Sequence, residues 1–168
     1  MSTSAHRLVI ALLIAGIAFG QVRAQARTQG PASQLAFAAF TLQRQGHIVV
    51  AVIINGQRAN LALDTGSSVT LIDEASAARL KLKVEKGSGD RAIGAGAYGA
   101  QVRPAYGNRL AIGSLQLPQA TLRVLDLSYA VTALSTSKTP VHGVLGADIL
   151  TRHGAVIDYP QKRVTFTK

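Results

Sequence analysis

One short segment of the chain carries residue types that suit hydrolytic chemistry, the run LALDTGSS from Leu61 to Ser68. It places a carboxylate, Asp64, at the end of an apolar stretch and inside a loop of glycine and small hydroxyl residues. A lone buried carboxylate is unfavourable, but two that face each other can share one proton. The ionised member can then take a proton from water while the protonated member donates to a substrate carbonyl. The segment predicts hydrolysis at Asp64 that needs no cofactor, no metal ion and no cysteine.

The residues on both sides of this segment are predicted to form strands. Residues 57–63 alternate between apolar and polar side chains, as a strand with one buried face does. The Asn55-Gly56 pair in front of them favours a type I′ turn, because both central residues of that turn need a positive φ. The turn would join residues 57–63 to an apolar strand at 47–54, and residues 69–72 are predicted as a further buried strand. Asp64 would therefore lie at the end of a hairpin strand.

The rest of the chain is also rich in strand signals, and the sequence predicts an all-β domain with two short helices. Further strands are expected at 37–42, 141–145, 155–159 and 163–167, and within 90–127, which Gly107-Asn108, Gly113-Ser114 and Pro118 interrupt. The helices are expected at 74–82, with Asp73 as the N-cap, and at 147–153, with Gly154 ending it. Residues 129–139 read as a loop with one helical turn.

Apolar-apolar-Asp-Thr-Gly-Ser resembles the active-site loop of retropepsin-like aspartic proteases, the single-lobed relatives of pepsin. The family's second signature, an apolar pair, a glycine and then a helix, is matched by Val144, Leu145 and Gly146. The strands expected after residue 155 also resemble those that close bacterial, secreted members. The resemblance spans roughly residues 36–168 and implies a closed β-barrel with one lobe per chain.

The resemblance also implies roles for individual residues. Asp64 matches the catalytic aspartate, and Thr65 matches the residue whose hydroxyl braces two active-site loops against each other. Gly66 matches the position where the backbone approaches the carboxylate, and Ser67 is similar to the small residue that hydrogen-bonds the outer carboxylate oxygen. Since the sequence has one Asp-Thr-Gly where pepsin-type enzymes have two, the resemblance implies a homodimer that acts on peptide or protein substrates.

A glycine-rich segment, Gly94 to Gly99 (GAGAYG), has the spacing GxGxxG. A dinucleotide site would require a helix after it and an acidic residue about 20 positions later. Pro104 opposes that helix, and the residue 20 positions after Gly99 is Gln119, so a nucleotide site is excluded. In the family this stretch corresponds to a flap over the peptide, which would include Ile93, Gly94, Gly96 and Tyr98; a plain connecting hairpin is the alternative.

The composition narrows the possible partners. The chain has 168 residues, 18 basic against 8 acidic side chains, and no cysteine. Such a surplus of positive charge is compatible with nucleic-acid binding. The basic residues are scattered, however, and there is no tryptophan among the few aromatic residues to form a stacking platform. We therefore expect a solvated basic surface with no nucleic-acid partner.

Residues 1–26 resemble a secretory signal peptide. An apolar run of 13 residues, Leu8 to Gly20, precedes the small-x-small pattern Ala24-Gln25-Ala26, and cleavage is expected after Ala26. The run is too short to span a bilayer. Residues 27–35 would then be a flexible lead-in to the domain at 36–168, and the protein would be periplasmic or extracellular.

A second function remains open at this level. A non-catalytic module that binds peptide or cell-envelope fragments could use the same fold, since fold does not determine function. His142 lies where relatives commonly have an acidic residue, just before the second signature, and this departure leaves room for such a module.

Overall fold

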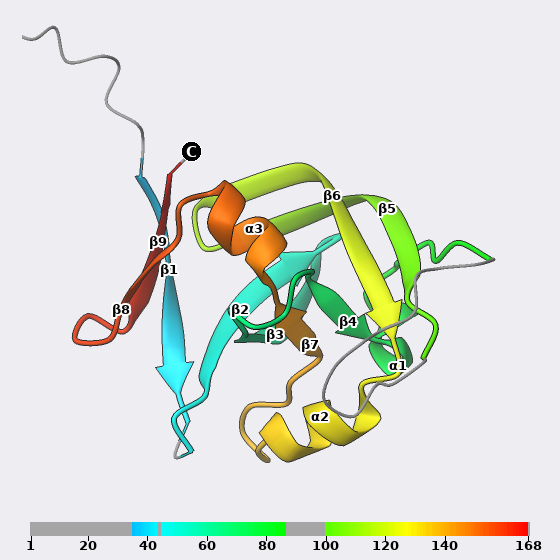
Figure 1. The fold of residues 1–168 in the computed structure, drawn as a ribbon, viewed down its shortest axis with the longest axis horizontal. Coiled ribbons are helices and arrows are strands. Elements are labelled where there is room, and N and C mark those ends of the chain that lie inside the picture. The colour runs from blue at the N-terminus through cyan, green and yellow to red at the C-terminus, as the bar shows by residue number, and fades with distance from the viewer. Residues whose placement is uncertain (1–34, 44, 87–99, 168) are drawn as a thin grey trace, which may run out of the picture. The chain divides into compact units, whose positions relative to one another are not determined.

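The computed structural model describes residues 35–43, 45–86 and 100–167 (Figure 1). The described residues form nine strands and three helices. The strands are β1 (Leu35–Leu42), β2 (Ile48–Ile54), β3 (Gln57–Leu63), β4 (Leu71–Asp73), β5 (Arg103–Ile112), β6 (Leu115–Leu125), β7 (Gly143–Leu145), β8 (Val156–Asp158) and β9 (Arg163–Thr167). The helices are α1 (Glu74–Ala77), α2 (Ser128–Leu134) and α3 (Ala147–Arg152). The signal peptide at 1–26 and the flap residues Ile93, Gly94, Gly96 and Tyr98 lie outside the described residues.

Six strands close into a barrel in the order β3-β7-β4-β6-β5-β2, and β2 pairs with β3 to complete the ring. The predicted closed all-β barrel is therefore confirmed. β1 pairs with β2 through its last residues and with β9 through its first, so that β1, β9 and β8 extend the sheet beyond the barrel (Figure 1). β1 begins at Leu35, one residue inside the expected lead-in.

The barrel interior is filled by the inward-facing residues of almost every strand. Along β1 the burial alternates from Leu35 to Thr41, as expected for a strand with one covered face. Most of the largest completely buried side chains belong to this core, which continues under β1 and β9, among them Phe166, Ile54, Leu61, Ile72, Leu110, Ile112, Leu122 and Leu145. A second, smaller cluster of Val49, Ala62, Val141 and Val144, flanked by Leu71, Val131 and Leu134, forms apart from this core.

The Asn55-Gly56 turn between β2 and β3 is confirmed. Asn55 has φ +49° and Gly56 has φ +81°, the two positive values that a type I′ turn needs. The Asn55 amide also donates to the carbonyl oxygens of Leu80 and Lys81 and to Asn108 Oδ1. The turn thus fastens the segment after α1 to the barrel.

The first predicted helix is shorter than expected. The helix expected at 74–82 ends at Ala77, and a turn follows in which Lys81 takes φ +54°. The Lys81 N–H donates to the Ala78 carbonyl oxygen and the Leu82 N–H donates to the Ala77 carbonyl oxygen, and these two bonds with the left-handed Lys81 close the end of the helix.

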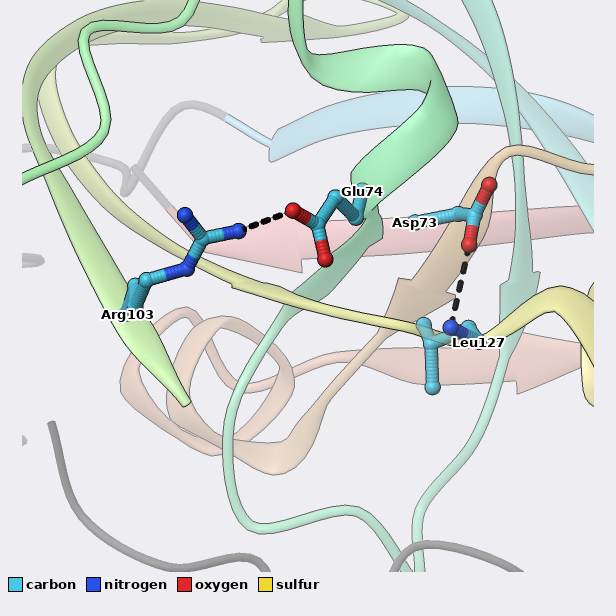
Figure 2. Close-up of polar contacts among 4 residues, drawn as sticks. All are labelled: Asp73, Glu74, Arg103 and Leu127. Atoms are coloured by element: carbon cyan, nitrogen blue, oxygen red, sulfur yellow. Dashed lines mark hydrogen bonds and ion pairs between the residues drawn. The ribbon is translucent and has the colours of Figure 1, made fainter. Parts of the chain in front are cut away.

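The predicted N-cap contact of Asp73 is absent. Its buried carboxylate accepts the backbone N–H of Leu127 (3.0 Å) at the end of β6, while Glu74 forms an ion pair with Arg103 on β5 (Figure 2). These two acidic side chains attach the start of α1 to β6 and β5.

Two further differences concern the second half of the barrel. Residues 103–125 form a hairpin that turns at Gly113-Ser114, but Asn108 and Pro118 lie inside its strands. Shifts in register near Asn108 accommodate them. The region expected as a loop with one helical turn contains α2, which has seven residues. Before it the Asp126 carboxylate accepts the Ser128 N–H (3.0 Å), and this bond lowers the pKa of Asp126.

Candidate active site

Asp64 lies immediately after β3, in a loop that is fastened to β7. β3 and β7 pair in parallel, with Leu63 opposite Leu145. The Asp64 backbone N–H donates to the Leu145 carbonyl oxygen (3.0 Å). The structure thus brings the Asp-Thr-Gly segment and the second signature, far apart in the sequence, into adjacent strands.

The Asp64 carboxylate points to the surface and has one hydrogen bond from the described residues. The backbone N–H of Gly66 donates to Asp64 Oδ1 (2.9 Å). A Cβ on Gly66 would lie 3.2 Å from this oxygen, so glycine allows the backbone to approach the carboxylate closely. The remaining lone pairs stay available to water or to a second carboxyl group.

The rest of the loop is held by hydrogen bonds of Ser67 to residues on either side of the site. The Ser67 hydroxyl donates to the Val69 carbonyl oxygen (2.7 Å), and the Ser67 carbonyl accepts the Ala147 N–H (2.8 Å) at the start of α3. In this structure the Ser67 hydroxyl therefore supports the loop and does not contact the Asp64 carboxylate as the resemblance implied. Thr65 is exposed, and within the described residues its hydroxyl forms no hydrogen bond to another loop.

Gly146 lets the second signature pack directly on the Asp64 loop. A Cβ at this position would lie 2.3 Å from the Val69 carbonyl oxygen and 2.4 Å from the Val69 carbonyl carbon. The neighbouring Gly143 has φ +159° and a similar approach to the backbone of Leu71. Gly146 therefore allows β7 to lie against the end of the Asp64 loop, and Gly143 allows it to lie against β4.

The sequence from 50 to 149 matches the family model described as aspartyl protease, a span that includes both signatures. The chain belongs to the aspartyl protease family. Its fold is similar to that of the protease of EIAV in complex with the inhibitor HBY-793, with a TM-score of 0.50 and 21% identity over 67% of this chain and 92% of that one. It is also similar to a retropepsin-like aspartic protease from Rickettsia conorii, with a TM-score of 0.53 and 17% identity over 79% and 91% of the two chains. A comparison with curated proteins found no match.

Thr70 links the strand after the Asp64 loop to the second signature, a contact that the sequence did not predict. Its buried hydroxyl accepts the Gly146 N–H (3.1 Å) and donates to Asp148 Oδ1 (2.7 Å). Asp148 lies in the first turn of α3, where its carboxylate also accepts the Ile149 N–H. The one signal for Thr70 in the sequence is a hydroxyl residue next to the strand that follows the Asp64 loop.

His142 belongs to the support of β7. Its Nδ1 accepts the Asn60 backbone N–H (3.0 Å), which requires this nitrogen to be unprotonated. Partial burial and the nearby positive charge of Arg79 lower the pKa of His142. The departure from the family pattern thus has a structural use, since His142 binds the end of the loop before β7 to β3.

Metal and membrane sites were searched over the described ranges. No three His, Asp or Glu side chains lie close enough there to hold a metal ion. Within the same ranges, no helix has the length and apolar character needed to cross a bilayer.

Proposed function

We propose that the protein is an exported aspartic endopeptidase whose active site is assembled from two copies of the chain. The observation that carries this proposal is the exposed Asp64 carboxylate on a loop that is braced at Ser67, Thr70 and Gly146. A rigid loop with an open carboxylate is what general acid–base catalysis requires, because the reacting group must be held in place without using up its hydrogen-bonding capacity.

In the proposed mechanism, the Asp64 residues of two subunits share one proton. The ionised carboxylate takes a proton from the attacking water as its oxygen bonds to the peptide carbonyl carbon. The protonated carboxyl donates its proton to the carbonyl oxygen, giving a tetrahedral diol. Collapse of the diol breaks the C–N bond as a proton passes to the amine nitrogen. No covalent bond to the enzyme forms at any step.

The sheet of β1, β9 and β8 offers surface for the second copy. Phe37 and Val156 both pair with Thr165, so they lie on the same face of this sheet. Phe37 is 58% exposed, Val156 is 61% exposed, and Leu35, two residues before Phe37, is 67% exposed. Apolar side chains clustered in this way favour association with another surface.

The decisive experiment compares the purified chain with its Asp64→Asn variant on a mixture of peptides, with cleavage followed by mass spectrometry. The wild type should cleave, and the variant should not, because an amide cannot share a proton in the dyad. Sedimentation with and without a statine-type inhibitor should show a dimer that the inhibitor stabilises. A wild type that binds peptides as a monomer and leaves them intact would favour the non-catalytic binding module.

Export is tested separately. If residues 1–26 form a cleaved signal, the protein recovered from the cell exterior or periplasm should begin at Arg27. N-terminal sequencing of the mature chain gives this directly, and a chain that retains Met1 in the cytoplasm would contradict export.

A further inference from the structure

A groove of about 440 Å³ lies between β6 and α3, next to the Asp64 loop. Its lining includes Leu117, Thr121 and Arg123 of β6 and Asp148 and Arg152 of α3. Val69, whose carbonyl accepts the Ser67 hydroxyl, lines the same groove. Figure 1 shows α3 beside β6 on this part of the barrel.

The strand register connects this groove to Asp64. Ala62 pairs with Val144, Val144 with Leu71, and Leu71 with Arg123, which makes one row across β3, β7, β4 and β6. Paired residues of neighbouring strands point to the same face of a sheet. The first three belong to the cluster outside the main core, so Arg123 lies on that outer face too.

Asp64 follows Ala62 by two residues, and the period-2 alternation of a strand places its side chain on the same face. Three steps between strands of about 4.8 Å separate β3 from β6, about 14 Å in all. An extended peptide covers this distance in about four residues at roughly 3.3 Å each. Val131 and Leu134 of α2 pack against the cluster that holds Ala62, Val144 and Leu71, so a peptide from Asp64 would pass beside this row, over Val69 and Thr121, to reach Arg123.

The charges at the groove favour an anion. Arg123 and Arg152 line it, and neither guanidinium has an ion-pair or hydrogen-bond partner among the described residues. The one carboxylate in the lining, Asp148, accepts two hydrogen bonds from within the chain, from Thr70 and Ile149. Two unpaired guanidinium groups exceed this single charge, and guanidinium groups bind carboxylates with two parallel hydrogen bonds.

We propose that this groove binds an acidic side chain of the substrate, three to five residues from the bond that is cut, with Arg123 as the main contact and Arg152 as the second. The proposal rests on the proposed function, because it adds a substrate preference to the same site. The enzyme would then prefer substrates with acidic segments, and the basic surface of the protein would also attract such segments.

The test is a cleavage profile. A peptide library made from a digested proteome is incubated with the wild type, with Arg123→Gln and with Arg109→Gln, and the cut sites are identified by mass spectrometry. Arg109 is an exposed arginine on β5 outside this groove, so its variant makes the same change in net charge. We expect Asp or Glu to be enriched three to five residues from the cut site with wild type and Arg109→Gln. With Arg123→Gln the enrichment should disappear.

Matched peptides then give the size of the effect. For a peptide from this profile, replacing the acidic residue by Gln should lower kcat/KM of the wild type about tenfold, mainly through KM, as expected for the loss of one charged contact. The same replacement should change kcat/KM of Arg123→Gln less than about twofold. An equal response of the wild type and Arg123→Gln would overturn the proposal.

A binding measurement separates this proposal from the proposed function. Fluorescein-labelled hexaglutamate and hexaglutamine are titrated with the Asp64→Asn protein, alone and combined with Arg123→Gln or Arg109→Gln. Tighter binding of hexaglutamate that only Arg123→Gln weakens would support the groove even if the wild type cleaves nothing. Equal weakening by both arginine variants would show general attraction to a basic surface and would overturn the groove, whatever the cleavage result.

Discussion

The two ends of β3 each hold a polar side chain, Asn55 before the strand and Asp64 after it, and the structure uses them in opposite ways. The Asn55 amide nitrogen donates to three oxygens, and its Oδ1 accepts the Arg109 N–H (3.0 Å). Asp64 has one hydrogen bond to its carboxylate from the described residues, from Gly66. Asn55 is therefore committed to the fold, whereas Asp64 keeps most of its bonding capacity for a partner outside the chain. Substitutions at the two ends should separate stability from activity.

The largest effect is expected at Asp64. Asp64→Asn should lower peptidase activity by at least about 10³-fold, because the shared proton of the dyad is lost. The thermal unfolding midpoint should stay nearly unchanged, since the amide oxygen can still accept the Gly66 N–H. Asp158→Asn, a carboxylate in the terminal hairpin, is the control and should retain activity. An Asp64→Asn protein that cleaves as fast as the wild type would contradict the proposed mechanism.

The second largest effect is expected at Gly146, which packs against the loop that carries Asp64. In Gly146→Ala the new Cβ would overlap the backbone of Val69, and relief of this overlap must move the Asp64 loop or β7. We expect a loss of about 2–4 kcal/mol in the free energy of unfolding, together with reduced activity of the folded protein. Urea denaturation and peptide cleavage measure the two losses.

Gly46→Ala is the matched control for this substitution. Gly46 has φ +86°, but no atom lies within 4 Å of a Cβ added there. Its alanine variant should lose only about 1 kcal/mol, from backbone strain alone. Equal losses in the two variants would mean that the close contact of Gly146 with the loop is unimportant.

A smaller effect, on stability alone, is expected at the other end of β3. Asn55→Asp keeps a residue that tolerates a positive φ but removes the amide donor, leaving the oxygens of Leu80, Lys81 and Asn108 without it. The free energy of unfolding should fall by about 1–3 kcal/mol, while activity per folded molecule should be unchanged. Asn55→Gly, without any new charge, should show a similar loss. Lower specific activity in both variants would contradict the conclusion that Asn55 serves stability alone.

The smallest effect is a pH dependence that arises in the middle of β3, where His142 Nδ1 accepts the Asn60 N–H. The pKa of His142 is lower in the folded protein than its ordinary value of 6.5, so the unfolded chain takes up this proton first as the pH falls. Stability should therefore decrease as the pH drops below about 6.5, by less than about 1 kcal/mol for this half-buried group. His142→Asn supplies an acceptor that does not titrate, and denaturation between pH 5 and 7.5 should show a flatter profile. An unchanged slope would assign the pH dependence to other groups.

Local signals in the sequence predicted the parts of the fold that depend on local conformation. The Asn55-Gly56 turn and the end of α3 at Gly154, with φ +50°, follow from backbone preferences that neighbouring residues cannot easily override. The predicted helix at 74–82 stops early because Lys81 adopts a positive φ, a conformation that a lysine does not signal in the sequence. The predicted cap of Asp73 depended on its carboxylate, which accepts a hydrogen bond from Leu127, far along the chain, instead. The sequence does not reveal such competition.

The candidate site shows the same difference between what local residues predict and what distant residues decide. The sequence by itself determined which chemistry to propose, because an aspartate in a loop of small residues after an apolar strand, with a second apolar-Gly signature, is a pattern of residue types. Only the tertiary structure decided what surrounds that aspartate. It shows that Ser67 and Thr70 brace the loop and that Arg123 shares a face with Ala62 across four strands. These relations depend on parallel pairing and register between strands far apart in sequence, which arise only when the whole barrel closes.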